Sequence, residues 1–189
     1  MKAKQISLLA LILLFAGSIY AQNLKVNIEK SELKWTGKKV TGQHVGHIKL
    51  KDGLLIVKDD KIATGSFNID MKSITNDDLQ DADYNQKLVG HLKSDDFFGV
   101  EKFPVTSLVI TESSKFVNNQ ADIKGNLTIK GKTNPIEFKA IRSGNTFTAS
   151  IAVDRAKYDV RYGSGSFFDN LGDKVIDDIF TIDVVLVVE

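Results

Sequence analysis

The stretch Gly65-Ser66-Phe67-Asn68-Ile69-Asp70-Met71 alternates apolar with small or polar side chains along its length. Successive side chains of a β-strand point to opposite sides, so Phe67, Ile69 and Met71 share one face of an extended chain. The residues between them share the other face. The stretch is therefore predicted to be a strand with one face buried in a core.

The same alternation recurs on both sides of this strand. It marks residues 24–28, 33–35, 48–50, 54–57, 105–111, 121–130, 136–141, 147–153 and 179–188. The segments Asp52-Gly53, 59–61, Asn118-Asn119 and 143–145 have turn-forming compositions and fit between these strands. Short connections favour antiparallel pairing, so we predict an all-β fold of about eight to ten meandering strands.

One segment departs from the alternation. Tyr84, Leu88 and Leu92 are spaced four residues apart, which is typical of one face of a helix, and Asp83 is predicted to be the N-cap. A single short helix among many antiparallel strands favours a β-barrel of about eight strands, with the helix near one end. A β-sandwich is the structural alternative.

The connection that follows the predicted helix is rich in phenylalanine. Residues 90–104 read Gly-His-Leu-Lys-Ser-Asp-Asp-Phe-Phe-Gly-Val-Glu-Lys-Phe-Pro. Three aromatic rings in one connection indicate a lid over the mouth of an apolar space, or a group of rings that fills one end of the core.

The first 21 residues have the pattern of a secretory signal peptide. Lys2 and Lys4 precede an apolar run at residues 6–15, and small residues lead to Ala21. We expect cleavage near Ala21 and Gln22, which leaves residues 22–189 as one domain in the periplasm or the secreted fraction. No later segment approaches the roughly 20 apolar residues of a membrane-spanning helix, so an integral membrane protein is not expected.

Composition excludes several other classes of protein. The chain has 25 Lys and Arg against 24 Asp and Glu, with neither sign gathered in a long block, which argues against a nucleic-acid-binding surface. It contains no cysteine, so no disulfide framework is possible and the hydrophobic core must stabilise the fold.

Four segments, in this order, resemble the YceI-like lipid/polyisoprenoid-binding family. They are residues 65–74, residues 91–98 with Phe103-Pro104, residues 125–131 with Pro135, and Asp154-Arg155 with Tyr158. The resemblance covers essentially the whole chain after the signal peptide. The chain departs from the family pattern in the acidic stretch 76–84 and at Lys87-Leu88, where the pattern has Arg-Asp.

The resemblance implies an elongated, lipocalin-like antiparallel β-barrel around an apolar tunnel, in a protein of the bacterial periplasm. The tunnel would hold the tail of an amphiphilic isoprenoid lipid, either a polyisoprenoid or an isoprenoid quinone, with no other cofactor. Strand alternation then predicts these tunnel-lining residues: Phe67, Ile69, Met71, Leu108, Ile110, Ile123, Leu127, Phe138, Ile151 and Val153. From the helix and the loops we add Leu88, Leu92, Phe97, Phe98, Phe103, Tyr158, Phe167 and Phe168.

Two side chains are predicted to contact the lipid head group. Arg155 ends an alternating strand close to Tyr158 and Tyr162, where a guanidinium could meet a phosphate or quinone oxygen. A salt bridge from Arg155 to a nearby aspartate or a facing strand is the alternative. His91 lies beside the leucine stripe of the helix, where it either contacts the head group or makes a structural hydrogen bond.

The remaining polar residues do not form a recognisable catalytic or metal site. His44 and His47 are three apart, so a regular strand points them to opposite faces, and only a bulge at Gly46 would bring them onto one metal ion. No nucleophile elbow or catalytic cysteine is present. We therefore expect a binding protein and not an enzyme. A ligand-free structural or stress-response module and an exported enzyme for an apolar substrate are the alternatives, and the sequence leaves the oligomeric state, a homodimer included, open.

Overall fold

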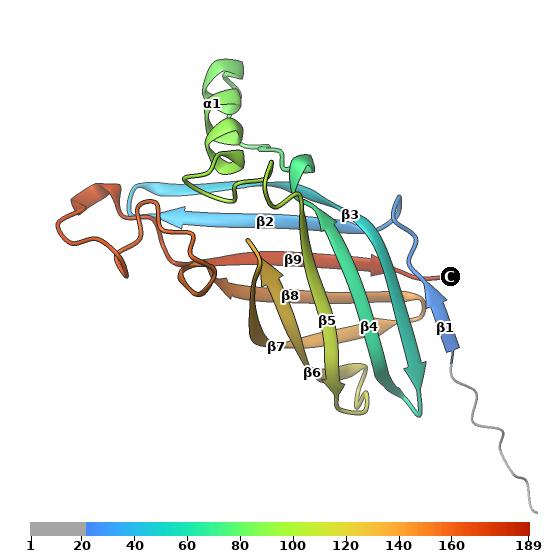
Figure 1. Cartoon of the computed structure of the whole chain (residues 1–189). Coiled ribbons are helices and arrows are strands. Elements are labelled where there is room, and N and C mark those ends of the chain that lie inside the picture. Colours follow the sequence, from blue (N-terminus) through green and yellow to red (C-terminus); the bar gives the residue numbers. More distant parts are fainter. Residues whose placement is uncertain (1–21) are drawn as a thin grey trace, which may run out of the picture.

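The computed structural model describes residues 22–189, which fold around one continuous antiparallel sheet (Figure 1). The predicted signal peptide lies outside the described residues. The strands are β1 (Gln22–Lys25), β2 (Glu32–Lys39), β3 (Gly42–Lys58), β4 (Lys61–Asp70), β5 (Val105–Ser113), β6 (Gln120–Ile129), β7 (Lys132–Ser143), β8 (Thr146–Asp154) and β9 (Ile179–Val187). The helices are α1 (Ala82–Lys93) and the short 3₁₀ turns η1 (Met71–Ser73), η2 (Arg155–Tyr158) and η3 (Gly172–Lys174).

The sheet closes on itself. The strand order is β1-β3-β2-β9-β8-β7-β6-β5-β4, and β3 also pairs with β4, which joins the two ends of this order. Strands β2 to β9 therefore form a closed eight-stranded antiparallel barrel, which confirms the predicted fold and excludes the sandwich. Strand β1 is additional and pairs with the second half of β3, where Leu24 faces Leu55.

The predicted turn at Asp52-Gly53 is wrong, because both residues lie inside the 17-residue strand β3. Asp52 pairs with Asn68 and Gly53 with Phe67, directly after a register shift. A Cβ atom on Gly53 would lie 2.9 Å from Cγ2 of Val26 and 3.0 Å from Cδ1 of Phe67. Glycine is needed here for close packing in a curved sheet, and the chain reverses later, at Asp59 and Asp60, whose positive φ angles of 53° and 58° suit a tight hairpin.

The helix forms where predicted but begins two residues earlier. Asp81, not Asp83, is the N-cap, since its side chain accepts hydrogen bonds of 3.0 Å from the backbone N–H groups of Asp83 and Tyr84. None of the 12 residues of α1 is buried. Figure 1 shows the helix standing on the outside of the barrel, close to one end.

The interior of the barrel is apolar because every strand places alternate side chains inward. In β6, Ala121, Ile123, Gly125, Leu127 and Ile129 are buried, while the residues between them are exposed or half-buried. The same alternation makes β4 bury Phe67 and Ile69, as the sequence pattern predicts.

Candidate functional site

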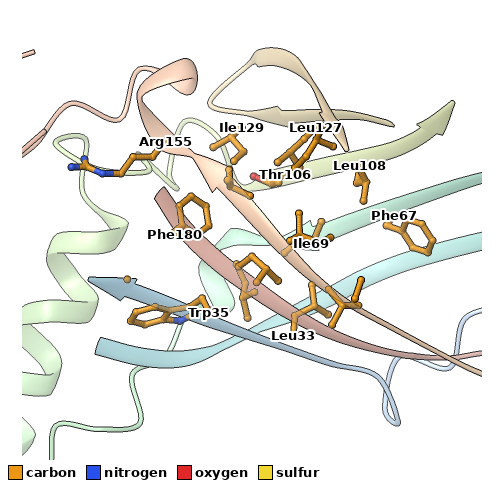
Figure 2. Close-up of a pocket in the computed structure, with 18 of the residues that line it drawn as sticks. Leu33, Trp35, Phe67, Ile69, Thr106, Leu108, Leu127, Ile129, Arg155 and Phe180 are labelled. Carbon is orange, nitrogen blue, oxygen red and sulfur yellow. The ribbon is translucent and has the colours of Figure 1, made fainter. Parts of the chain in front are cut away.

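The barrel encloses a cavity of about 280 Å³ (Figure 2). Side chains from all eight barrel strands and from α1 line it. Along β4 the lining extends from Ile62 to Ile69, which is roughly 23 Å at about 3.3 Å per residue. At the end near Ile62, Phe147 lines the cavity and packs against Phe116, with ring centroids 6.0 Å apart. The cavity is therefore long, narrow and mostly apolar.

The structure brings most of the predicted lining residues to this cavity. They are Phe67, Ile69, Met71, Leu88, Leu92, Phe97, Phe98, Leu108, Ile110, Ile123, Leu127, Phe138, Ile151 and Val153. Both interpretations of the phenylalanine-rich connection hold in part, because Phe97 and Phe98 cover one end of the cavity and also pack edge to face at 5.3 Å.

Four predicted lining residues lie elsewhere, and the tunnel assignment is corrected for them. Phe103 is half-buried beside Gly131. Tyr158 is buried and packs in one cluster with the lining residues Ile151 and Val153, but it does not line the cavity itself, because the chain turns into η2 after β8 and strand alternation no longer applies. Phe167 and Phe168 are 39% and 50% exposed on the loop after η2.

Several lining residues went unnoticed in the sequence. Strand β9 contributes Phe180, Ile182, Val184 and Leu186, and β2 contributes Leu33 and Trp35. The sequence shows their alternation, because the charged Asp183 identifies the outward-facing positions of β9. The sequence does not show the order in which the strands pair to close the barrel. Thr106 of β5 is a buried polar side chain in the lining and lies across from Ile69. Figure 2 shows it among the apolar side chains of the cavity.

One end of the cavity has polar walls, and we call it the mouth. It is lined by Lys38 and Lys39 at the end of β2, His44 of β3, His91 of α1 and Asp177 before β9. The backbone N–H of Asp177 donates to the carbonyl of Lys38 at 2.9 Å, which holds two walls of the mouth together. The titratable side chains of the lining thus gather where the cavity meets the surface.

Arg155 reaches this region but its charged group points away from the cavity (Figure 2). The side chain is 2% exposed, and its N–H groups donate at 2.8 to 3.0 Å to the carbonyls of Val160, Tyr162, Ile176 and Asp177. A carboxylate oxygen of Asp178 lies 3.3 Å away. Burial lowers the pKa of Arg155, and the neighbouring aspartates oppose that shift. The geometry gives Arg155 a structural role, in which its side chain joins two loops. This role resembles the predicted alternative, a salt bridge to a nearby aspartate, more than a contact with a head group.

His91 sits among aromatic rings at the mouth. Its imidazole makes edge-to-face contacts with Phe97, at 5.7 Å between centroids, and with Tyr162, at 4.3 Å. The ring lines the cavity and is half-buried, so it is placed where a head group would lie. Of the two predicted head-group residues, His91 is therefore the one whose side chain a ligand in the cavity can reach.

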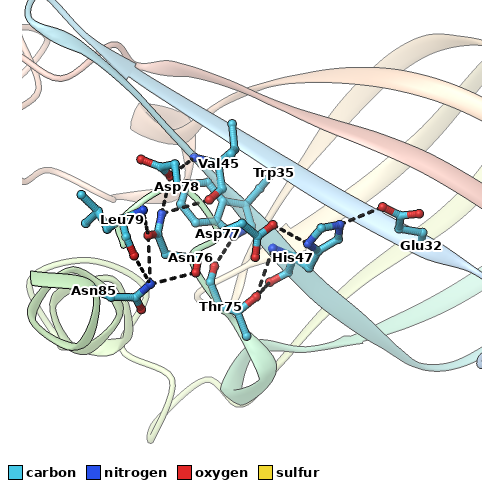
Figure 3. Close-up of polar contacts among 10 residues, drawn as sticks. All are labelled: Glu32, Trp35, Val45, His47, Thr75, Asn76, Asp77, Asp78, Leu79 and Asn85. Atoms are coloured by element: carbon cyan, nitrogen blue, oxygen red, sulfur yellow. Dashed lines mark hydrogen bonds and ion pairs between the residues drawn. The ribbon is translucent and has the colours of Figure 1, made fainter. Parts of the chain in front are cut away.

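His44 and His47 bind carboxylates. Nδ1 of His44 lies 2.7 Å from Asp78, and His47 lies between Glu32, 2.7 Å from Nε2, and Asp77, 2.6 Å from Nδ1. Figure 3 shows the His47 contacts. Within residues 22–189 no cluster of three or more His, Cys, Asp or Glu side chains is arranged to hold a metal ion. The same residues contain no helix that is long and apolar enough to cross a membrane.

Comparison with known proteins agrees with this architecture. The barrel superimposes on the crystal structure of Burkholderia cenocepacia BcnA with a TM-score of 0.67, at 23% identity over 87% of this chain and 99% of that one. A polyisoprenoid binding domain from Saccharophagus degradans, implicated in plant cell wall breakdown, gives a TM-score of 0.59 at 14% identity over 88% and 97% of the two chains. At these identities the likeness concerns the fold.

Sequence comparison adds a family assignment. A UPF0312 protein of Pseudomonas putida is 39% identical over 54 residues, which span 29% of this chain and only 28% of that relative. The family model described as the YceI-like domain matches residues 24–188, which is nearly the whole of the barrel and its helix. This chain therefore belongs to the YceI-like family.

Proposed function

We propose that this protein binds an amphiphilic isoprenoid lipid, a polyisoprenoid or an isoprenoid quinone, with the tail inside the barrel and the head group at the mouth. The observation that carries the proposal is the long apolar cavity whose titratable side chains gather at one end. A flexible apolar chain fits the cavity, and Lys38, Lys39 and His91 offer donors to an oxygen-rich head group. The structural neighbour from Saccharophagus degradans, a polyisoprenoid binding domain, supports this choice of ligand.

Burial of the tail supplies enough free energy for tight binding. Each buried methylene is worth about 0.8 kcal/mol, so a dozen carbons contribute roughly 10 kcal/mol before the cost of ordering the chain is subtracted. The head group then serves mainly to orient the ligand. This division of labour is typical of binding and transport and needs no catalytic group, so we propose a role in storage, transport or sequestration.

We also propose that the protein works outside the cytoplasm, in the periplasm or the secreted fraction, after cleavage near Ala21 and Gln22. The support is the signal-peptide pattern of residues 1–21. N-terminal mass analysis of protein from the native host tests this proposal. A mature chain that starts near Gln22 is expected, and retention of Met1 would reject it.

The binding proposal is tested with purified residues 22–189. We expect a fluorescent polyprenyl analogue to bind saturably, and unlabelled polyprenyl phosphate, polyprenol and quinone of equal tail length to compete with different strengths that rank the head groups. Mass spectrometry of an organic extract of the native protein identifies the natural ligand. No saturable binding at any tail length would leave a ligand-free structural module as the better description.

A further inference from the structure

A segment between β4 and α1 continues the barrel wall beside the first half of β3. We call residues 73–80 the strap. The backbone N–H of Thr75 donates to the carbonyl of His47 at 3.0 Å, and that of Asp77 donates to the carbonyl of Val45 at 2.9 Å. Strand β4 ends at Asp70, so beyond that point the strap takes over as the neighbour of β3 on this edge.

The strap fits closely onto the barrel at one glycine. A Cβ atom on Gly46 would lie 2.0 Å from the carbonyl oxygen of Thr75. The same carbonyl accepts a hydrogen bond of 3.0 Å from the indole N–H of Trp35, a residue that lines the cavity. The strap is therefore in contact with the cavity wall as well as with β3.

The strap also holds the beginning of α1. The side-chain amide of Asn85 donates to the carbonyls of Asn76, at 2.9 Å, and Leu79, at 3.1 Å. Asn76 is 7% exposed and donates in turn to the carbonyl of Val45 at 2.9 Å. These contacts join helix, strap and β3 in one network (Figure 3).

The helix has little else to fix its first turns. None of its residues is buried, yet Leu88, His91 and Leu92 line the cavity. Its last turn is fixed separately, since the backbone N–H of Val100 donates to the carbonyl of Lys93 and that of Phe98 to the carbonyl of Leu92. The helix can therefore act as a lid that is hinged at its end and latched at its beginning by the strap.

The latch contains a histidine, His47, that lies between two carboxylates. His47 faces a carboxylate oxygen with each ring nitrogen, at 2.6 and 2.7 Å. Only the doubly protonated imidazolium can donate to both, because a neutral ring has one N–H and one lone pair. Histidine as a residue type changes charge between about pH 5 and 8, whereas carboxylates stay ionised over that range.

The charges around both histidines support this interpretation. On the outer face, His47 meets Glu32 and Asp77 in contact, while Lys34 is its cross-strand partner on β2 and Lys49 follows on β3. Lys34 is itself paired in register with Asp183 of β9. His44 contacts Asp78 of the strap and shares the mouth with Lys38, Lys39, His91 and Asp177. Of the charged groups that face the two rings, the carboxylates of Glu32, Asp77 and Asp78 are the ones in hydrogen-bond contact.

We propose that the strap is a pH-sensitive latch, which holds α1 over the mouth while His47 is protonated and releases it when His47 loses its charge. Release lets α1 pivot about its fixed last turn, which moves Leu88 and His91 of the cavity lining and opens the cavity to ligand exchange. The effect on exchange rests on the proposed function, whereas the movement of the strap does not.

The latch itself is tested in ligand-free protein by NMR and amide hydrogen exchange from pH 5.5 to 8. Protection factors of the Thr75 and Asp77 amides, corrected for the intrinsic pH dependence of exchange, should fall roughly five- to tenfold across this range. They should be independent of pH in His47→Gln, which cannot change charge. In Asp77→Asn the amide can donate to a neutral ring, so the fall should shrink.

The control variant is Asp122→Asn, which removes a carboxylate 2.6 Å from Lys139 on the far-side strands β6 and β7. Its protection profile should match the native one. A native profile that does not change with pH, or one that persists in His47→Gln, would overturn the latch.

The consequence for exchange is tested by rapid mixing of the protein, loaded with a fluorescent polyprenyl analogue, into excess unlabelled lipid. Dissociation should be severalfold faster at pH 8 than at pH 5.5, and equal at both values in His47→Gln. A pH-independent rate in native protein that binds the probe would overturn gating by the strap. Failure of the probe to bind at any pH would count against the proposed function, and the exchange of the Thr75 and Asp77 amides would still decide the latch.

Discussion

Single side chains in this protein divide into those that shape the cavity and those that hold its frame. Ile123 is 1% exposed and lines the cavity from β6. Arg155 is almost as buried, but its guanidinium donates hydrogen bonds to backbone carbonyls. The two residues therefore predict different phenotypes, one in binding and one in stability.

Replacing Ile123 by Asp should abolish binding of a long-chain isoprenoid, because an unpaired carboxylate in the cavity costs several kcal/mol. Asn126→Asp is the matched control, since it adds the same charge to the outer face of the same strand. Fluorescent titration, after circular dichroism has verified folding, measures both. Equal affinity in the two variants would show that the ligand does not occupy the barrel.

Replacing Arg155 by Ala should lower the free energy of unfolding by about 3 kcal/mol, because four carbonyls in two loops lose their donor. Urea denaturation measures the loss. Arg161→Ala is the control: Arg161 is exposed, pairs with Asp159 and lies over the exposed Phe167 ring, so its removal should cost less than about 1 kcal/mol. If Arg155→Ala kept its stability but lost lipid binding, the structural role would be wrong and Arg155 would contact the head group as first predicted.

Asp78 predicts a pH dependence of stability at the acid end. Burial raises the pKa of its carboxyl, but hydrogen bonds from the Val45 N–H, His44 and Asn76 lower it more, so the net shift is downward. The folded state thus keeps the charge at lower pH than the unfolded chain does. Its contribution to stability is present above about pH 4 and is lost as the pH falls through the folded value.

We therefore expect Asp78→Asn to be less stable than the native protein at pH 7, by about 1 kcal/mol, and the difference to shrink between pH 4 and 2. Urea denaturation at several pH values measures this. A difference that stays constant down to pH 2 would show that the charge of Asp78 contributes nothing.

At the scale of elements, the strap and α1 each meet or contain a glycine, and the two glycines differ in whether a side chain would fit. Gly46 is covered by the carbonyl of Thr75, whereas a Cβ atom on Gly90 of α1 would have nothing within 4 Å. A methyl group at Gly46 must displace the strap from β3. One at Gly90 meets only solvent and improves helix propensity.

Gly46→Ala should destabilise the protein and remove the protection of the Asp77 amide, while Gly90→Ala should stabilise it by about 0.5 to 1 kcal/mol. Thermal denaturation combined with hydrogen exchange separates the two. If both alanine variants behave alike, the strap is not packed on Gly46 in solution.

At the scale of the whole molecule, the barrel offers a natural reporter of the ligand. Trp35 is the one tryptophan of the chain, and it lines the cavity two residues before Gly37 and three before Lys38 of the mouth. It is therefore closer to the mouth than to Phe147, at the opposite end of the cavity.

We expect an isoprenoid lipid brominated near its head group to quench Trp35 fluorescence severalfold more than one brominated at the tail end, because the head group lies at the mouth. The unbrominated lipid is the control for changes unrelated to contact. Stronger quenching by the tail-end bromine would mean that the ligand enters in the opposite direction.

Local pattern was enough to predict the β-class, the inward face of most strands and the presence of one helix. Strand alternation has a period of two residues, so the parity of Phe67 and Ile69 or of Ile123 and Leu127 can be read within a few positions of each residue. The positions of the hairpins at Asp59-Asp60 and Asn118-Asn119 also follow from local backbone preferences, since both carry positive φ angles.

Contacts between distant segments decided the rest. Closure depends on pairing of β3 with β4 and of β2 with β9, and the second of these joins residues about 150 positions apart, for which no local pattern exists. The carbonyls around Arg155 come from loops on both sides of residues 163–175, and His47 meets partners from β2 and the strap. The sequence alone thus determined which faces of the strands are apolar. Only the tertiary structure decided that these faces surround a cavity, that Arg155 is withdrawn from it and that His47 lies between two carboxylates, because those properties arise from register and loop packing between residues far apart in the chain.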